Sequence, residues 1–169
     1  MRHAFSWKKL SISAALAYRF DFERSRLWFQ TKAGSYNDES LIGFLRDLKK
    51  HLRGDKAILI WDGLPSHKSR KMKRYLDSQR SWLEAEPLPG YSPDLNPVEA
   101  MWGNVKGQEL ANRCVDGLSE AEAAVCNGML RVRRSHLPFS FPSSCINRRF
   151  TSPENENRST LVARFWGVG

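Results

Sequence analysis

Cysteine is scarce in this chain, and its placement excludes two kinds of small protein. The 169 residues include three cysteines, and no C-x-x-C pair occurs. A structural zinc site or a disulfide framework needs paired or closely spaced cysteines, so neither is expected. We therefore expect a protein of a reducing compartment, the cytoplasm, whose core depends on packing rather than on cross-links.

Long apolar runs are missing as well. A transmembrane helix needs roughly 18 or more apolar residues in succession, and no stretch of the sequence approaches that length. The N-terminal stretch MRHAFSWKKLSISAALAY joins basic residues to a short apolar run, as a weak signal peptide does. Residues 10–18 alternate strictly between two faces, however, and this pattern favours a strand. A membrane partner is not expected.

Acidic residues are outnumbered by basic ones. The chain has 18 Asp and Glu against 27 Lys and Arg, which gives a net charge of +9. Because a basic surface attracts phosphate groups, nucleic acid is the expected partner; a basic protein without a polyanion partner is the alternative. Hydrophobic residues make up 41% of the chain, enough for one compact domain with a core.

The apolar pattern of the first half predicts two strands, a helix and a third strand. Residues 10–18 alternate, and 26–31 are their expected hairpin partner. An amphipathic helix follows Asn37, a good N-cap residue, and ends near Gly54. The stretch AILIW at 57–61 is apolar at every position, which is typical of a central strand buried on both faces.

The second half continues this alternation and then loses it. The expected elements are a basic helix at 66–79, a short strand at 82–88, and helices at 94–111 and 119–134. This order predicts an α/β fold whose mixed sheet is antiparallel first, parallel later, and flanked by helices. We expect one domain over 1–135 and a poorly structured, Pro-, Ser- and Asn-rich tail over 136–169.

Asp62 directly follows the most apolar strand. Ligands of α/β sheets gather at the carboxyl ends of strands, so Asp62 is a candidate site residue. The alternative is a turn, because Asp followed by Gly63 is a common turn signal. His67, five residues after Asp62, is a candidate for contacting a phosphate or orienting Asp62; the alternative is an exposed helix residue.

Glu99 also has two interpretations. With Asn96 as N-cap and Pro97 at the first helical position, Glu99 stands at the third position of a capping box. It also lies beside the expected buried face of its helix, where its carboxylate could reach a metal site. Mg²⁺ prefers oxygen ligands, and carboxylates from different elements can converge to hold it.

Two stretches carry a resemblance to a known family. ILIWDGLPSHKS and LPGYSPDLNPVEAMWGNVKG resemble the second half of the catalytic domain of mariner-type and related bacterial insertion-sequence transposases. That DDE endonuclease domain has an RNase H-like fold and carries out metal-dependent DNA strand cleavage and strand transfer. The resemblance implies that Asp62 and Glu99 are the second and third catalytic acids and ligands of Mg²⁺, two ions in the family. The implied partner is DNA, namely the transposon ends.

The resemblance also implies that something precedes this chain. In the family the first catalytic Asp lies on a strand before the one that 10–18 resembles, so we expect truncation at the N-terminus and a first strand that is missing or incomplete. Asp21 and Glu23 are the nearest acids, at the wrong end of the expected hairpin. Enzymatic activity of the fragment is therefore left open. The alternative function is a non-catalytic nucleic-acid-binding remnant, or a regulator that pairs with another copy or with full-length transposase.

The remaining candidates are basic residues and one asparagine. The residues expected to contact DNA phosphates belong to the expected basic helix at 66–79: Lys68, Arg70, Lys71, Lys73 and Arg74. Asn96 and Lys106 are candidates for supporting the active site. A second cluster is Arg131, Arg133 and Arg134. For each of these basic residues the alternative is a solvated helix face.

Overall fold

The computed structural model describes residues 9–18, 25–62, 64–88, 96–111, 117–135 and, for the backbone alone, 158–168. The strands are β1 Leu10–Tyr18, β2 Ser25–Ala33, β3 Lys56–Trp61, β4 Leu83–Pro87 and β5 Arg158–Val168. The helices are α1 Asp38–His51, α2 Arg70–Ser78, α3 Pro97–Val105 and α4 Leu118–Arg134, with a 3₁₀ turn at Pro65–Lys68 and a π-helical turn at Lys106–Leu110. None of the described helices has the length and apolar character needed to cross a membrane.

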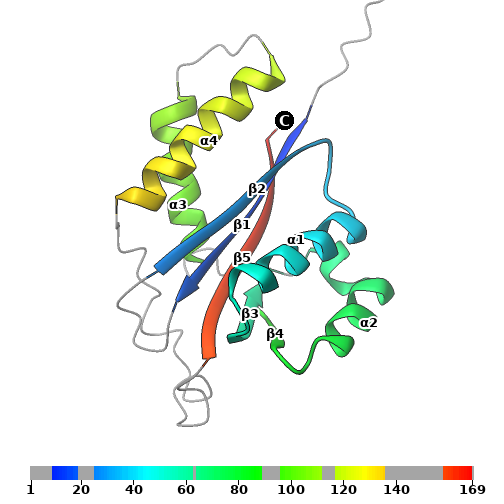
Figure 1. The fold of residues 1–169 in the computed structure, drawn as a ribbon. Helices are drawn as coiled ribbons and strands as arrows, with labels where there is room; N and C mark the ends of the chain where they lie inside the picture. Colours follow the sequence, from blue (N-terminus) through cyan, green and yellow to red (C-terminus); the bar gives the residue numbers. More distant parts are fainter. Residues whose placement is uncertain are drawn as a thin grey trace, which may run out of the picture.

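The five strands form one mixed sheet in the order β2-β1-β5-β3-β4. β1 is antiparallel to both β2 and β5, whereas β3 is parallel to β5 and β4. Helices α3 and α4 cover one face of the sheet, and α1 and α2 cover the other (Figure 1). The predicted α/β class, with a mixed sheet flanked by helices, is confirmed.

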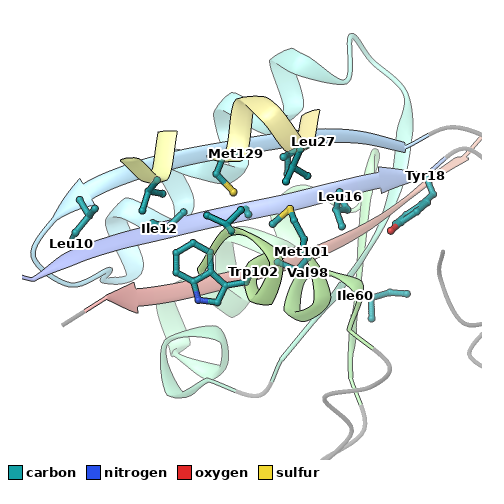
Figure 2. Packing of buried hydrophobic residues seen from close by; sticks show 14 of the residues in the cluster. Leu10, Ile12, Leu16, Tyr18, Leu27, Ile60, Val98, Met101, Trp102 and Met129 are labelled. Carbon is teal, nitrogen blue, oxygen red and sulfur yellow. The ribbon is translucent and has the colours of Figure 1, made fainter. Parts of the chain in front are cut away.

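Each face of the sheet has its own buried cluster. On the α3 side, alternate residues of β1 meet an apolar stripe of α3, and Met129 of α4 closes the cluster (Figure 2). On the α1 side, Leu41, Leu45 and Leu48 are fully buried against the intervening residues of the sheet. The alternating residues of β1 and the apolar stripe of α1 are therefore buried, as the sequence predicts.

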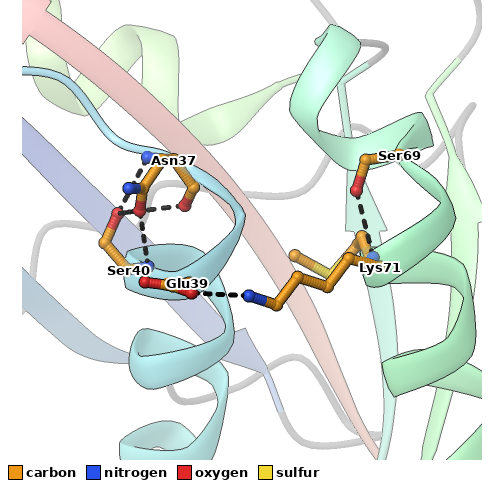
Figure 3. A network of polar contacts seen from close by, with 6 residues as sticks. Asn37, Glu39, Ser40, Ser69 and Lys71 are labelled. Atoms are coloured by element: carbon orange, nitrogen blue, oxygen red, sulfur yellow. Dashed lines mark hydrogen bonds and ion pairs between the residues drawn. The ribbon is translucent and has the colours of Figure 1, made fainter.

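Polar contacts hold α1 and α2 together on their face of the sheet. The side chain of Asn37 accepts a hydrogen bond from the Ser40 amide at 2.9 Å, and Ser40 Oγ accepts one from the Asn37 amide at 2.8 Å. Glu39, in the first turn of α1, pairs with Lys71 of α2 at 2.7 Å (Figure 3). This exposed pair, with its hydrogen bond from Lys71, lowers the pKa of the Glu39 carboxyl.

Arg131 joins α4 to the turn that follows α3. Its Nε donates to Glu109 Oε1 at 2.6 Å, and its Nη2 donates to Glu109 Oε2 at 3.1 Å and to Asn104 Oδ1 at 2.8 Å. A Cβ at Gly128 would lie 2.7 Å from Glu109, so the glycine leaves room for this pair. Of the predicted second basic cluster, Arg131 therefore has a structural partner within the fold.

The predicted tail contains a strand. Residues 158–168 form β5, inserted between β1 and β3 with continuous pairing to both, whereas a poorly structured segment is expected over 136–169. The sequence RSTLVARFWGV is rich in strand-forming residues, but it follows a Pro-, Ser- and Asn-rich stretch that obscures this pattern. Residues 136–157 lie outside the described part of the chain.

Candidate active site

Asp62 lies at the carboxyl end of β3, where the strand leaves the sheet. The strand is buried from Ala57 to Trp61, and the Asp62 side chain is one-fifth exposed (21%). The Leu88 amide donates to the Trp61 carbonyl at 2.7 Å, which fixes the chain after β4 against this end of β3. Asp62 therefore presents a partly accessible carboxylate on a rigid support.

His67 is folded back onto Asp62. Its Nδ1 lies 2.8 Å from the Asp62 carbonyl oxygen and 3.1 Å from Asp62 Oδ1. Because a carbonyl oxygen can only accept, Nδ1 carries the hydrogen. The ring stacks on Trp61 with centroids 4.1 Å apart and planes 4° from parallel, and its side chain is 2% exposed. The interpretation of His67 as an exposed helix residue is wrong.

The basic helix begins later than its sequence predicts, and this shift explains the position of His67. The 3₁₀ turn Pro65–Lys68 carries His67, and Ser69 then caps α2 by accepting from the Met72 amide at 3.0 Å. The capping serine separates the short turn from α2. The turn is therefore free to direct His67 inward while α2 keeps its basic residues outside.

Glu99 stands in the first turn of α3, with its side chain partly exposed. The Asn96 side chain accepts from the Val98 amide at 3.1 Å, and Pro97 occupies the first helical position. Asn96 is itself buried (2% exposed), so it acts as the N-cap from inside the fold. The Asn96 side chain therefore caps the first turn of α3.

The two acids lie close in sequence to residues of one buried cluster. Ile60 of β3 and Val98 of α3 both belong to the cluster on the α3 side of the sheet (Figure 2). Asp62 follows Ile60 by two positions, and Glu99 directly follows Val98. Within the described residues, no group of three or more His, Cys, Asp or Glu side chains is placed to hold a metal ion.

The predicted DNA-contacting residues are all exposed, but they differ in their contacts. Lys71 is engaged by Glu39 of α1. Lys68 directly follows His67 and has no acidic partner among the described side chains. Lys106, a candidate for supporting the active site, lies at the start of the π-helical turn, 5.7 Å over the ring of Trp102. The other three, Arg70, Lys73 and Arg74, are exposed on α2.

Several predicted features fall outside the described residues. These are Asp21 and Glu23, Gly63, and the segment 89–95 in front of α3. The stacking of His67 on Trp61 is a feature that sequence reasoning missed. The sequence signal for this contact is the aromatic residue immediately before Asp62. That signal is weak, because a buried strand is expected to be apolar at this position in any case.

Comparisons with known proteins connect this geometry to a family. The model of a family described as DDE superfamily endonuclease matches residues 6–120, which include both candidate acids. No curated protein matches the chain in sequence.

Solved structures with a similar fold include two of Mos1. The catalytic domain of Mos1 mariner transposase is 19% identical, with a TM-score of 0.47, covering 65% of this chain and 70% of that one. The Mos1 transposase paired-end complex with left transposon end is 20% identical, with a TM-score of 0.55, covering 75% of this chain. This chain spans 37% of the length of that transposase. A simian T-cell lymphotropic virus intasome in complex with a PP2A regulatory subunit is 12% identical, with a TM-score of 0.43, covering 66% of this chain and 39% of that one.

Proposed function

We propose that this chain, which belongs to the DDE superfamily endonucleases, is part of a transposase catalytic domain that binds DNA and cleaves it with a divalent cation. Membership of that family confirms the resemblance seen in the two sequence stretches. The observation that carries the proposal is the buried His67, which contacts the Asp62 carbonyl and carboxylate at the end of β3.

Asp62 and Glu99 are the Mg²⁺ ligands in this proposal. Mg²⁺ is usually bound through one or two carboxylates and keeps several of its waters, and Asp62 and Glu99 supply two partly exposed carboxylates. A second ion needs further ligands, and the described residues hold no group of three. When bound, the cation supplies Lewis-acid stabilisation and an activated water for cleavage of a phosphodiester.

His67 acts in this proposal as a positioning residue. A hydrogen bond from Nδ1 to the Asp62 carbonyl fixes the backbone at the end of β3, and the 3.1 Å contact with Oδ1 fixes the carboxylate rotamer. In known metal sites, loss of a group that orients a metal ligand lowers metal affinity or activity by roughly 10- to 100-fold. The π-stacked Trp61 in turn holds the imidazole ring.

Nicking of supercoiled plasmid DNA tests the proposed activity. The chain is expected to convert supercoiled to open-circular plasmid in Mg²⁺ or Mn²⁺, and EDTA should abolish the conversion because the chemistry depends on the cation. Gel electrophoresis of the plasmid measures both. Salt-sensitive DNA binding without any metal-dependent nicking would contradict cleavage by this chain and match the non-catalytic alternative.

Lys68 gives a prediction about DNA contact near Asp62. Lys68→Gln should weaken binding of a labelled duplex and lower the slope of log affinity against log salt by about 1, because one phosphate contact is lost. Lys56→Gln is the matched control: Lys56 is also exposed, but it lies at the start of β3, and Asp62 follows the other end. Fluorescence anisotropy at several salt concentrations measures the slope; equal changes in both variants would reduce the effect to net charge.

A further inference from the structure

A basic pocket opens at the edge strand β2, away from the candidate acids. β2 is the outermost strand, and β1 and β5 separate it from β3. The pocket has a volume of about 780 Å³ and joins residues of β2, the end of α1 and the end of α4. The residues that define its chemistry are Arg26, Trp28, Lys50, His51, Arg53 and Arg133.

The positive charge of this pocket is largely uncompensated. Asp47 is the acidic residue of the lining, and it is engaged by Lys50 at 2.9 Å and by Gln30 at 3.1 Å. Arg26, Arg53 and Arg133 make no ion pair with any acidic group in the described part of the chain. Three arginines therefore line one cavity without an acidic partner among the described residues.

Two aromatic rings form the wall of the pocket. Trp28 and His51 lie with ring centroids 4.6 Å apart and planes 33° from parallel. Trp28 Nε1 is buried and has no hydrogen-bond acceptor among the described residues. Burial lowers the pKa of His51, and the nearby Arg133, Arg26 and Arg53 lower it further. An anion in the pocket would supply negative charge beside these basic residues.

Structural explanations cover only some of these basic residues. Cations in the last turns of α1 and α4 stabilise the helix ends, and charged residues on an edge strand discourage aggregation. Lys50 and His51 fit the first explanation, as does Arg133, and Arg26 fits the second. Arg53 lies beyond the end of α1 with a positive φ of 54°, so neither explanation accounts for it.

We propose that this pocket binds the phosphate backbone of a nucleic acid at a second site, separate from the candidate acids. Its volume exceeds what a single phosphate group needs, and its cations come from three elements, an arrangement that suits a strand with repeated phosphates. Arginines are well matched to phosphate oxygens because their planar guanidinium groups donate in pairs. The inference does not require cleavage, since it concerns binding in the absence of metal.

Arg133 and Arg134 provide a matched pair of variants for the test. Both are exposed, lie in the last turn of α4, and lack an ion-pair partner among the described residues, but only Arg133 lines the pocket. Anisotropy of a labelled duplex in EDTA should show binding weakened about fivefold by Arg133→Gln, with the salt slope reduced by about 1. Arg53→Gln should behave like Arg133→Gln, whereas Arg134→Gln should change affinity less than about twofold.

Three outcomes would overturn the inference. Equal losses of affinity in Arg133→Gln and Arg134→Gln would reduce the effect to net charge. A lowered thermal midpoint in Arg133→Gln with unchanged DNA affinity would assign the arginine to the helix end alone. Weakened binding to vesicles of anionic phospholipid, with DNA binding unchanged, would assign the pocket to a different polyanion. Because no metal is present, a failure here is distinct from a failure to nick plasmid DNA.

Discussion

Asp62→Asn is expected to abolish metal-dependent nicking of plasmid DNA, with a loss of at least about 100-fold, the upper end of effects measured for groups that merely orient a metal ligand. Asparagine has the shape of aspartate and keeps an oxygen for the Leu64 amide, which lies 3.4 Å from Asp62 Oδ1. It lacks the negative charge that a Mg²⁺ ligand supplies. The rate of supercoiled-plasmid conversion measures the effect, and Mn²⁺ affinity by calorimetry provides a readout that does not depend on cleavage.

The control for Asp62 flanks the opposite end of the same strand. Asp55 is exposed just before β3, at the end of the strand opposite to Asp62, so Asp55→Asn should leave both nicking and Mn²⁺ affinity within about twofold of the parent. Equal losses in the two variants, or unchanged nicking in Asp62→Asn, would contradict the assignment of Asp62.

The His67→Ala variant should lose roughly 10- to 100-fold in nicking rate. His67→Asn, whose amide can replace the Nδ1 donor, should recover part of that loss.

Local patterns in the sequence were sufficient to locate Asp62 and Glu99, because each stands at a boundary that short-range chemistry defines. The apolar stretch before Asp62 predicts a buried strand and therefore the place where the strand ends. Asn96 and Pro97 predict where α3 begins and hence the turn that carries Glu99. Their roles as metal ligands are not fixed by these patterns and stay a proposal.

The contact between His67 and Asp62 was harder to predict, because it depends on the geometry of the loop between them. His67 follows Asp62 by only five residues, yet its burial depends on a 3₁₀ turn that ends at the capping Ser69. Helical periodicity treats that turn as the start of α2, so the sequence left open whether His67 contacts Asp62 or is exposed on the helix. The basic pocket is harder still, because Arg26, Arg53 and Arg133 come from distant parts of the chain.

The central position of β5 gives the largest expected effect on stability. It pairs with β1 along Leu10–Tyr18 and with β3 along Lys56–Trp61, so it connects the two halves of the sheet. Proline at position 162 would remove a ladder hydrogen bond from an interior strand, where proline is almost never tolerated. We expect Val162→Pro to abolish the cooperative unfolding transition, because a domain of this kind is stable by only about 5–15 kcal/mol. Circular dichroism during urea unfolding measures the transition.

Val162→Thr is the matched control, since threonine is also β-branched and keeps the backbone N–H. It should unfold cooperatively, with a midpoint much closer to that of the parent than to that of Val162→Pro. Deletion of residues 158–169 should match Val162→Pro, because without β5 the strands β1 and β3 each present unpaired backbone groups in the middle of the sheet. A deletion variant that still unfolds cooperatively at the parent midpoint would contradict the central role of β5. Partial recovery of that variant by an added peptide of residues 158–168 would show that the place between β1 and β3 accepts a strand supplied separately.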